Sequence, residues 1–324
     1  MANIKDVAKL ANVSVATVSR VINNKGYVNG ETKKMVEVAI EELNYIPNEF
    51  ARSLFKKVSK TIGVIFPHLS NSFYYSVLEG IEEEAFKKGY KVMICNTHED
   101  KERELEYLKQ FVRYNIDGLI TGSNSDVQFK YEELNIPLVS IDRIIDDAIP
   151  SVMSDNEGGG CLAAEKLING GCTNIVHFRG PSMLLTVQQR TLGFEKQLKT
   201  KGIGCTQVDL AFIDPEIELI RDYLEKHPEI DGVFCDSDLI AAGVLFVLGR
   251  LGKHVPDEVQ VIGYDNTSLA NLVTPKLTTV SQRMIDMGKE AMFSLNALMD
   301  SEELIEHKLI PVDLVEREST KEKK

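Results

Sequence analysis

The residues best suited to chemistry in this chain follow short apolar runs with the composition of β-strands. Such polar and aromatic side chains are Asn71, Ser72, Phe73 and Tyr74, then Asp142 and Arg143, then Asp236, Ser237 and Asp238, and finally Asp265 and Gln282. A further cation, Arg190, follows the run that ends at Phe178. Ligands of open α/β sheets bind at the carboxyl ends of the strands. The sequence therefore predicts that these side chains converge on one cleft.

This mixture of side chains suits a small neutral polyol. Carboxylates and guanidinium groups form strong hydrogen bonds to hydroxyls, and aromatic rings can cover the apolar face of a sugar. Each residue alone also has a plain structural interpretation, since Asp142 and Arg143 could form a surface ion pair and Phe73 could belong to the core. The full set at successive strand ends favours a sugar.

The elements that must position these residues alternate in type from residue 61 onward. Short apolar runs predict strands over 61–66, 91–96, 118–121, 137–141, 174–178, 232–235 and 259–264. Amphipathic segments predict helices over 75–88, 102–114, 158–167, 186–199, 216–226 and 239–251. Alternation of this kind is typical of parallel sheets covered by helices on both faces. The two series predict an α/β core with two lobes.

The first 45 residues have a different pattern. Apolar residues recur at helical spacing in three short runs, and Ser14 is a good N-cap for the second run. Asn12 stands in the tight turn before it, where a residue that tolerates positive φ is needed. We expect a helix-turn-helix unit whose second helix exposes Val15, Ala16, Thr17, Ser19 and Arg20 to a DNA major groove. A three-helix bundle that contacts protein is the alternative.

The segment after Pro47 forms a separate hypothesis. Residues 49–55 make about two turns of helix, which is marginal in water without a partner. A helix that forms only when two copies pair on DNA could insert Leu54 between base steps in the minor groove. A linker with a nascent helix is the plainer alternative.

Composition and charge limit the class of protein. The chain has 324 residues, 43% hydrophobic and 27% charged, as expected for a soluble globular protein of about two domains. The net charge is −12, but residues 1–59 carry nine Lys and Arg against six Asp and Glu. So small a basic excess requires dimeric or additional contacts to hold DNA. The chain shows neither a signal peptide nor an apolar run of the roughly 18 residues that span a bilayer, which predicts a cytoplasmic protein without membrane contact.

Other chemistries have weaker support. Residues 158–163 match a loose Gly-x-Gly-x-x-Ala dinucleotide pattern, but no acidic residue follows at the required distance. The six histidines lack His-x-x-x-His spacing, and no nucleophile elbow or phosphate-binding loop is present. We therefore expect no cofactor, no metal and no enzymatic activity. The cysteines are widely spaced and are interpreted as buried thiols: Cys95, Cys161, Cys172, Cys205 and Cys235.

The N-terminal motifs resemble those of the lactose/galactose repressor (LacI/GalR) family of bacterial transcription factors. The resemblance is carried by residues 4–11 (IKDVAKLA), 13–23 (VSVATVSRVIN), 43–48 (LNYIPN) and 51–54 (ARSL), and it extends over nearly the whole chain. It implies a helix-turn-helix domain over 1–46, a hinge over 47–59 and a periplasmic-binding-protein-like core over 60–324. The implied lobes of that core are about 60–157 plus 284–312, and about 158–283 plus 313–324.

The resemblance also implies roles for individual residues. Val15, Ala16 and Arg20 are expected to face base edges and Leu54 to be the minor-groove lever, with Ser14, Thr17, Ser19 and Asn23 on the same DNA-contacting surface. Two departures are that Asn12 replaces a more usual Gly and that Phe55 follows the lever where a basic residue is common. The implied effector contacts are Asn71, Phe73, Tyr74, Asp142, Arg143, Arg190, Ser237, Asp265 and Gln282.

Within that set, the Asp142–Arg143 pair with Asp265 and Gln282 resembles a pentose site of the ribose type, and Phe212 is a further stacking candidate. The resulting hypothesis is a homodimeric repressor on a pseudo-palindromic operator, controlled by a small sugar. Alternatives are a sugar-binding module that contacts protein, or a regulator with a disaccharide or purine effector.

Overall fold

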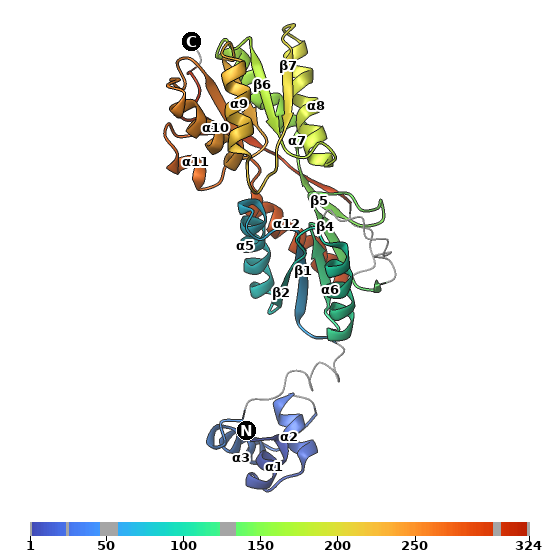
Figure 1. Ribbon diagram of the computed structural model, residues 1–324. Helices are drawn as coiled ribbons and strands as arrows, with labels where there is room; N and C mark the ends of the chain where they lie inside the picture. The colour runs from blue at the N-terminus through green and yellow to red at the C-terminus, as the bar shows by residue number, and fades with distance from the viewer. Residues whose placement is uncertain (1, 24–25, 46–57, 124–133, 301–305, 323–324) are drawn as a thin grey trace. The chain divides into compact units, whose positions relative to one another are not determined.

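The computed structural model describes residues 2–23, 26–45, 58–123, 134–300 and 306–322. Contacts divide the chain into two units, residues 1–59 and 60–324 (Figure 1). Each unit has a hydrophobic core of its own. Among the described residues, no helix is both long and apolar enough to cross a membrane.

The first unit contains the three predicted helices, α1 (Ile4–Leu10), α2 (Val15–Ile22) and α3 (Gly30–Glu42). Local side-chain chemistry explains where they begin. Asn3 and Asp6 form a reciprocal capping box, and the Ser14 hydroxyl accepts from the Thr17 backbone N–H at 3.1 Å. Asn12 has a φ of 51°, as the turn between α1 and α2 requires. The helices pack around fully buried valines, which confirms the three-helix prediction: Val7, Val18 and Val36.

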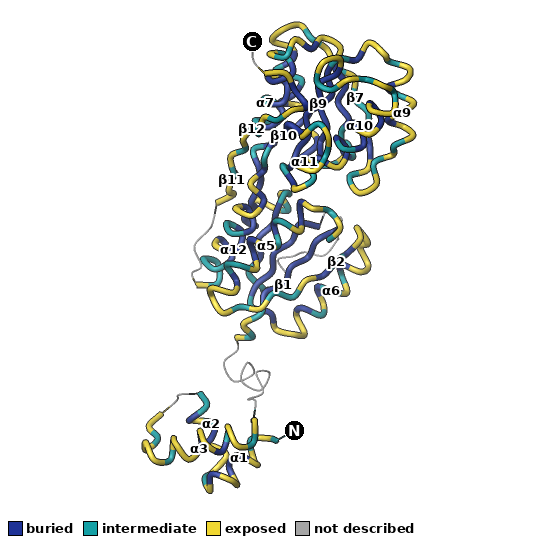
Figure 2. The backbone as a smooth tube through the Cα atoms, turned by 90° about the vertical axis from the view of Figure 1, so that its left-hand side faces the viewer, coloured by how far each residue is buried: buried dark blue, intermediate teal, exposed yellow. Residues whose placement is uncertain are grey.

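The second unit begins with a lobe built on a six-stranded parallel sheet of order β11-β5-β4-β3-β1-β2. Its strands are β1 (Thr61–Phe66), β2 (Lys91–Asn96), β3 (Gly118–Thr121), β4 (Leu138–Ile141), β5 (Ser151–Ser154) and β11 (Lys308–Ile310). One face packs against α5 (Ser72–Lys87) and α12 (Met284–Asp300), and the other against α6 (Lys101–Tyr114). Helices on both faces leave the inner strands, such as β1, buried, as Figure 2 shows, whereas the edge strands β2 and β11 are partly exposed.

The other lobe repeats this architecture with a sheet of order β12-β10-β9-β8-β6-β7, in which only β12 is antiparallel. Its strands are β6 (Ile175–Arg179), β7 (Cys205–Asp209), β8 (Gly232–Cys235), β9 (Gln260–Asp265), β10 (Thr278–Ser281) and β12 (Asp313–Val315). Helices α7 (Asn156–Asn169) and α8 (Leu185–Lys199) cover one face. The opposite face is covered by α9 (Ile217–Lys226), α10 (Asp238–Arg250) and α11 (Leu269–Leu272). The two-lobed α/β prediction is confirmed.

The chain passes between the lobes at three places, after β5, after β10 and after β11. These crossing segments are bonded to one another. The Asp155 backbone N–H donates to the Ile310 carbonyl at 2.9 Å, and the Arg283 guanidinium donates to the Asp313 carboxylate at 2.9 Å and 2.5 Å. The sequence pattern did not indicate β5, β7, α11, α12, β11 or β12. The strands among them are short or partly polar, which leaves little apolar periodicity to detect.

Close packing of α7 on α8 explains Gly160 of α7 and Gly193 of α8. A Cβ at Gly160 would lie 2.1 Å from the Arg190 carbonyl oxygen, and one at Gly193 would lie 1.9 Å from the Glu157 carbonyl oxygen. Only residues without side chains let the two helix backbones approach so closely. Gly160 and Gly193 therefore serve helix packing and place α8 with its Arg190 against α7.

We expect Gly193→Ala to destabilise the core by about 3 kcal/mol, because a methyl group there meets a helix backbone that cannot move aside. Differential scanning calorimetry of the full chain should show the core transition lowered by roughly 5–10 °C. Gly249→Ala is the matched control, since a Cβ at this exposed glycine of α10 has no heavy atom within 4 Å. Equal effects of the two substitutions would contradict the packing argument.

Candidate ligand-binding cleft and nucleic-acid interface

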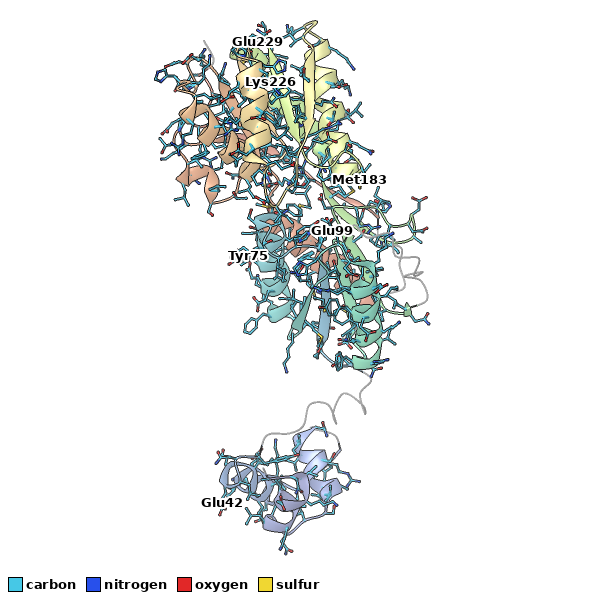
Figure 3. All side chains as sticks on the ribbon, viewed as in Figure 1. Glu42, Tyr75, Glu99, Met183, Lys226 and Glu229 are labelled. Carbon is cyan, nitrogen blue, oxygen red and sulfur yellow. The ribbon has the colours of Figure 1, made fainter. Side chains whose placement is uncertain are left out.

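A cleft lies at the carboxyl ends of the strands of both lobes. It holds about 570 Å³ of space, continuous with solvent. The first lobe contributes Pro67, His68, Asn71, Phe73, Tyr74, Glu99 and Asp142, and the second contributes Leu184, Thr186, Arg190, Phe212, Ile213, Asp236 and Asp265; Gln282 comes from a crossing segment. Figure 3 shows Glu99 and Met183 near the level where the lobes meet. This is where the topology of parallel sheets predicts a ligand.

Arg190 is the central cation of the cleft. Its side chain is 3% exposed, its Nε donates to Asn156 Oδ1 at 2.8 Å, and its Nη1 donates to the Asp236 carbonyl at 2.8 Å. The guanidinium also lies 3.9 Å from the centre of the Tyr264 ring. The side chain is thus held in one orientation while it lines the cleft, so it can donate to a ligand oxygen with little loss of freedom on binding.

Two carboxyl groups in the cleft have raised pKa values. Burial raises the pKa of Asp142 to about 6, although the positive charge of Arg190 opposes the shift. Burial also raises the pKa of Asp265 well above its ordinary value, against the same opposing charge. Both residues have positive φ, 59° and 106° respectively. Backbone of this kind is costly for a residue with a side chain and is concentrated at functional sites.

Two buried acceptor atoms face this region without a partner among the described residues. They are Asp142 Oδ1 and Gln282 Oε1. The Gln282 amide nitrogen donates to Asp265 Oδ1 at 2.6 Å. The amide oxygen Oε1, on the other side of the amide group, therefore points away from Asp265. Buried acceptors without donors are costly in free energy. A ligand with hydroxyl donors would satisfy both atoms.

Aromatic rings supply the apolar surface of the cleft. Asn71 caps α5 by accepting from the Phe73 backbone N–H at 3.0 Å, so α5 begins at Ser72 and not at the predicted residue 75. Phe73 and Tyr74 therefore lie in the first helical turn, with ring centres 5.0 Å apart in an edge-to-face arrangement. Phe212 joins them from the second lobe. These rings can cover the C–H faces of a sugar.

Of the residues expected to contact the effector, the structure brings together on the cleft Asn71, Phe73, Tyr74, Asp142, Arg190, Asp265 and Gln282. Arg143 and Ser237 do not line it. The Arg143 guanidinium donates to the Ser123 carbonyl, and the Ser237 hydroxyl accepts from the Ile240 backbone N–H as the N-cap of α10. Arg143 follows Asp142 and Ser237 follows Asp236, and both aspartates line the cleft. The turn after each strand determines which of the two neighbouring side chains points inward.

Several lining residues were absent from the expected set. Asp236 directly follows β8; it was among the strand-end residues predicted to reach the cleft, but not among the effector contacts that the resemblance implies. His68, Glu99, Leu184, Thr186 and Ile213 lie in loops or at a helix start, where periodicity carries no information. Within the described residues, no group of three or more His, Cys, Asp and Glu side chains is placed to hold a metal ion.

Helix α2 presents the expected DNA-contacting surface. Ser14, Val15, Ala16 and Arg20 are exposed, whereas Thr17, Ser19 and Asn23 are half-buried. Val15 is 40% exposed although it is apolar. The Asn23 side-chain amide donates to the Ser19 carbonyl at 2.8 Å, where it supports the end of α2. Apolar side chains can contact a thymine methyl group and arginine can bond the edge of guanine, so this face can read bases. Leu54 lies outside the described residues.

Comparison with known proteins places both units in one family. Residues 3–48 match the family of bacterial regulatory proteins, lacI family. Residues 59–318 match the family of periplasmic binding proteins and sugar binding domain of the LacI family.

Individual relatives span nearly the full chain. The ribose operon repressor of Halalkalibacterium halodurans is 41% identical over 323 residues, covering 99% of this chain and 98% of that protein. The lac repressor dimer bound to operator and an anti-inducer aligns with a TM-score of 0.90 at 26% identity, over 98% of this chain and 99% of that one. A LacI-type regulator from Alkaliphilus metalliredigens complexed with D-xylulofuranose aligns with a TM-score of 0.75 at 32% identity, over 81% and 100% of the chains. The chain belongs to the LacI family of bacterial transcriptional regulators, with a DNA-binding helix-turn-helix unit and a sugar-binding core.

Proposed function

We propose that this regulator is a homodimeric repressor whose affinity for a pseudo-palindromic operator is set by a pentose of the ribose type. The observation that carries the proposal is the cleft chemistry: one oriented guanidinium, several carboxylates and aromatic faces. The comparisons add support, because relatives of similar length are named ribose operon repressors and a solved relative holds D-xylulofuranose.

Each part of the cleft has a role in this proposal. Sugar hydroxyls donate to the Asp142 and Asp265 carboxylates and accept from Arg190, which makes charge-assisted hydrogen bonds. The rings of Phe73 and Phe212 cover the two apolar faces of the sugar ring. A furanose or small pyranose would use all of these contacts at once. Arg143 and Ser237 act in this scheme through the backbone turns that they support.

The proposed regulation is a linkage between the cleft and the DNA-binding unit. Because the cleft is lined from both lobes, a sugar that contacts both stabilises one angle between them. The three crossing segments are the places where that angle can change. A coupling free energy of about 1–3 kcal/mol would change operator affinity roughly 5- to 150-fold.

The proposed organisation has a DNA-reading domain at 1–46, a hinge at 47–59 and an effector core at 60–324. In the dimer, the hinge segments of two copies pair on the operator and Leu54 of each copy enters the minor groove. Since the operator is chromosomal DNA of a bacterium, we propose that the protein acts in the cytoplasm.

Two measurements on the full chain test the proposal. Isothermal titration calorimetry against D-ribose, D-xylulose, sucrose and a purine base identifies the effector class. Selection of bound duplexes from a random pool, followed by fluorescence anisotropy over a salt series with and without the sugar, measures operator affinity and its coupling. We expect pentose binding, selected duplexes with two related half-sites, and a steep salt dependence. Binding of only a disaccharide or purine would overturn the effector class, and unselective DNA binding would overturn the repressor.

Ribose affinity should fall as the pH drops through about 6. The raised pKa of Asp142 means that its carboxylate takes up a proton near that pH, whereas sugar hydroxyls favour the ionised acceptor. The raised pKa of Asp265 shifts the dependence in the same direction. Calorimetry at pH 7.5 and pH 5 should show affinity lower by at least about threefold at the lower pH. Asp142→Asn removes the titrating acceptor and should flatten this dependence, and tighter binding at pH 5 would contradict the assignment.

A further inference from the structure

Behind the cleft, the wholly buried His177 of β6 contacts one of the residues that line it. His177 Nε2 lies 2.9 Å from Asp236 Oδ1, and both side chains have no exposed surface. Because an ionised carboxylate can only accept hydrogen bonds, the imidazole Nε2–H is the donor. His177 does not itself line the cleft. Its direct contact with a lining residue is the hydrogen bond to Asp236.

Asp236 is the point where three contacts meet. Its Oδ1 accepts from His177, its Oδ2 accepts from the Gly180 backbone N–H at 3.0 Å, and its carbonyl oxygen accepts from Arg190 Nη1 at 2.8 Å. The first two contacts hold the carboxylate in one rotamer. The third connects the same residue to the central cation of the cleft. A change in the position of Asp236 would thus displace both a lining carboxylate and the guanidinium.

Packing alone does not explain an imidazole at this place. The His177 ring stacks on Phe234 with ring centres 4.5 Å apart and also contacts Phe194 at 5.3 Å. A phenylalanine would fill such an aromatic site without burying a polar atom. His177 Nδ1, by contrast, is buried and has no hydrogen-bond partner among the described residues. A buried polar atom without a partner is unfavourable. The hydrogen bond to Asp236 is the contact that only the imidazole supplies.

We propose that His177 is a positioning residue for sugar binding: its Nε2–H fixes the Asp236 carboxylate and, through the Asp236 backbone, the orientation of Arg190. This inference rests on the proposed function, namely binding of a sugar in the cleft. Without the donor, the carboxylate keeps only the Gly180 N–H and is free to rotate. The polar groups of the cleft then no longer match the ligand's hydroxyls.

The test compares two substitutions of His177 in the full chain, with D-ribose as the probe in calorimetry. His177→Phe keeps an aromatic ring in the stack and removes the donor. His177→Gln keeps an N–H at about the reach of Nε2 and removes the ring. We expect His177→Phe to weaken ribose binding at least about tenfold, and His177→Gln to stay within about threefold of the wild type. Phe194→Leu is the matched control, since it disturbs the same stack and leaves the bond to Asp236; it should also stay within about threefold.

Each outcome separates the positioning role from its alternatives. Wild-type affinity in His177→Phe would overturn the proposal, as would equal losses in the Phe and Gln variants, because that result indicates a packing role. Absence of ribose binding by the wild type would contradict the proposed function itself. If His177→Phe fails to fold, as judged by circular dichroism, His177→Leu takes its place. A sugar-free measurement adds to the test: in nitrogen-15 NMR, His177 should carry its proton on Nε2, and a proton found only on Nδ1 would overturn the inference.

Discussion

Arg190→Met should abolish ribose binding at neutral pH, with a loss of at least about a hundredfold. The guanidinium is the only Arg or Lys cation among the described residues that line the cleft, and the carboxyl groups of Asp142, Asp236 and Asp265 act on its charge. Truncating one partner of a buried, hydrogen-bonded charged contact with a ligand costs about 2–5 kcal/mol of binding free energy, and each 1.4 kcal/mol is a factor of ten in affinity. Arg190→Lys should be intermediate, since an ammonium group cannot reproduce the bonds to both Asn156 and the Asp236 carbonyl.

Arg143→Met is the matched control for this experiment. Arg143 was expected beside Asp142 in the effector site, but its guanidinium donates to the Ser123 carbonyl and does not line the cleft. We expect its replacement to change ribose affinity less than about fivefold, or about 1 kcal/mol, because the guanidinium does not line the cleft. Calorimetry of the three variants, with the unfolding temperature of each, distinguishes loss of binding from loss of fold. A hundredfold loss in Arg143→Met would show that Arg143 contacts the sugar, as the sequence-based assignment expected, and little loss in Arg190→Met would contradict the central role of Arg190 in the cleft.

Removal of residues 1–59 should eliminate operator binding and leave ribose binding unchanged. The helices of the first unit bury their own core around Val7, Val18 and Val36, and the two lobes bury theirs separately. Residues 60–324 carry 28 Lys and Arg against 43 Asp and Glu, a net charge of −15 that repels phosphates. The truncated protein should therefore take up ribose in calorimetry and show no anisotropy change with the selected duplex. Loss of both activities would contradict independent domains.

A point variant of the full chain tests the same surface without truncation. Arg20 is exposed on α2, and Arg20→Ala should weaken binding to the selected duplex by about 1–3 kcal/mol, or roughly 5- to 150-fold, while relaxing its sequence preference. Ribose affinity of this variant should equal that of the wild type. A uniform loss across all duplexes would indicate a phosphate contact in place of base reading.

Much of the first unit could be predicted from sequence because its structure is determined locally. Caps such as Ser14 and turn residues such as Asn12 act on backbone within three or four residues, and the helical spacing of the valines marks one buried face. The alternation of strands and helices in the core could also be predicted from the sequence, because buried parallel strands are nearly continuous apolar runs. Resemblance to a family added residue roles that spacing alone does not give.

The tertiary structure decided which neighbour in each strand-end pair reaches the cleft. Asp142 has a positive φ, which turns its side chain into the cleft while Arg143 points away. In the second pair, Ser237 caps helix α10 and leaves Asp236 to line the cleft. Such choices depend on the path of the chain after the strand and not on residue type. The bond from His177 to Asp236 joins residues 59 positions apart, and no local pattern indicates it. The amino-acid order thus determined the elements and the polar character of the strand ends, whereas the packing of distant strands and helices selected the side chains that form the site.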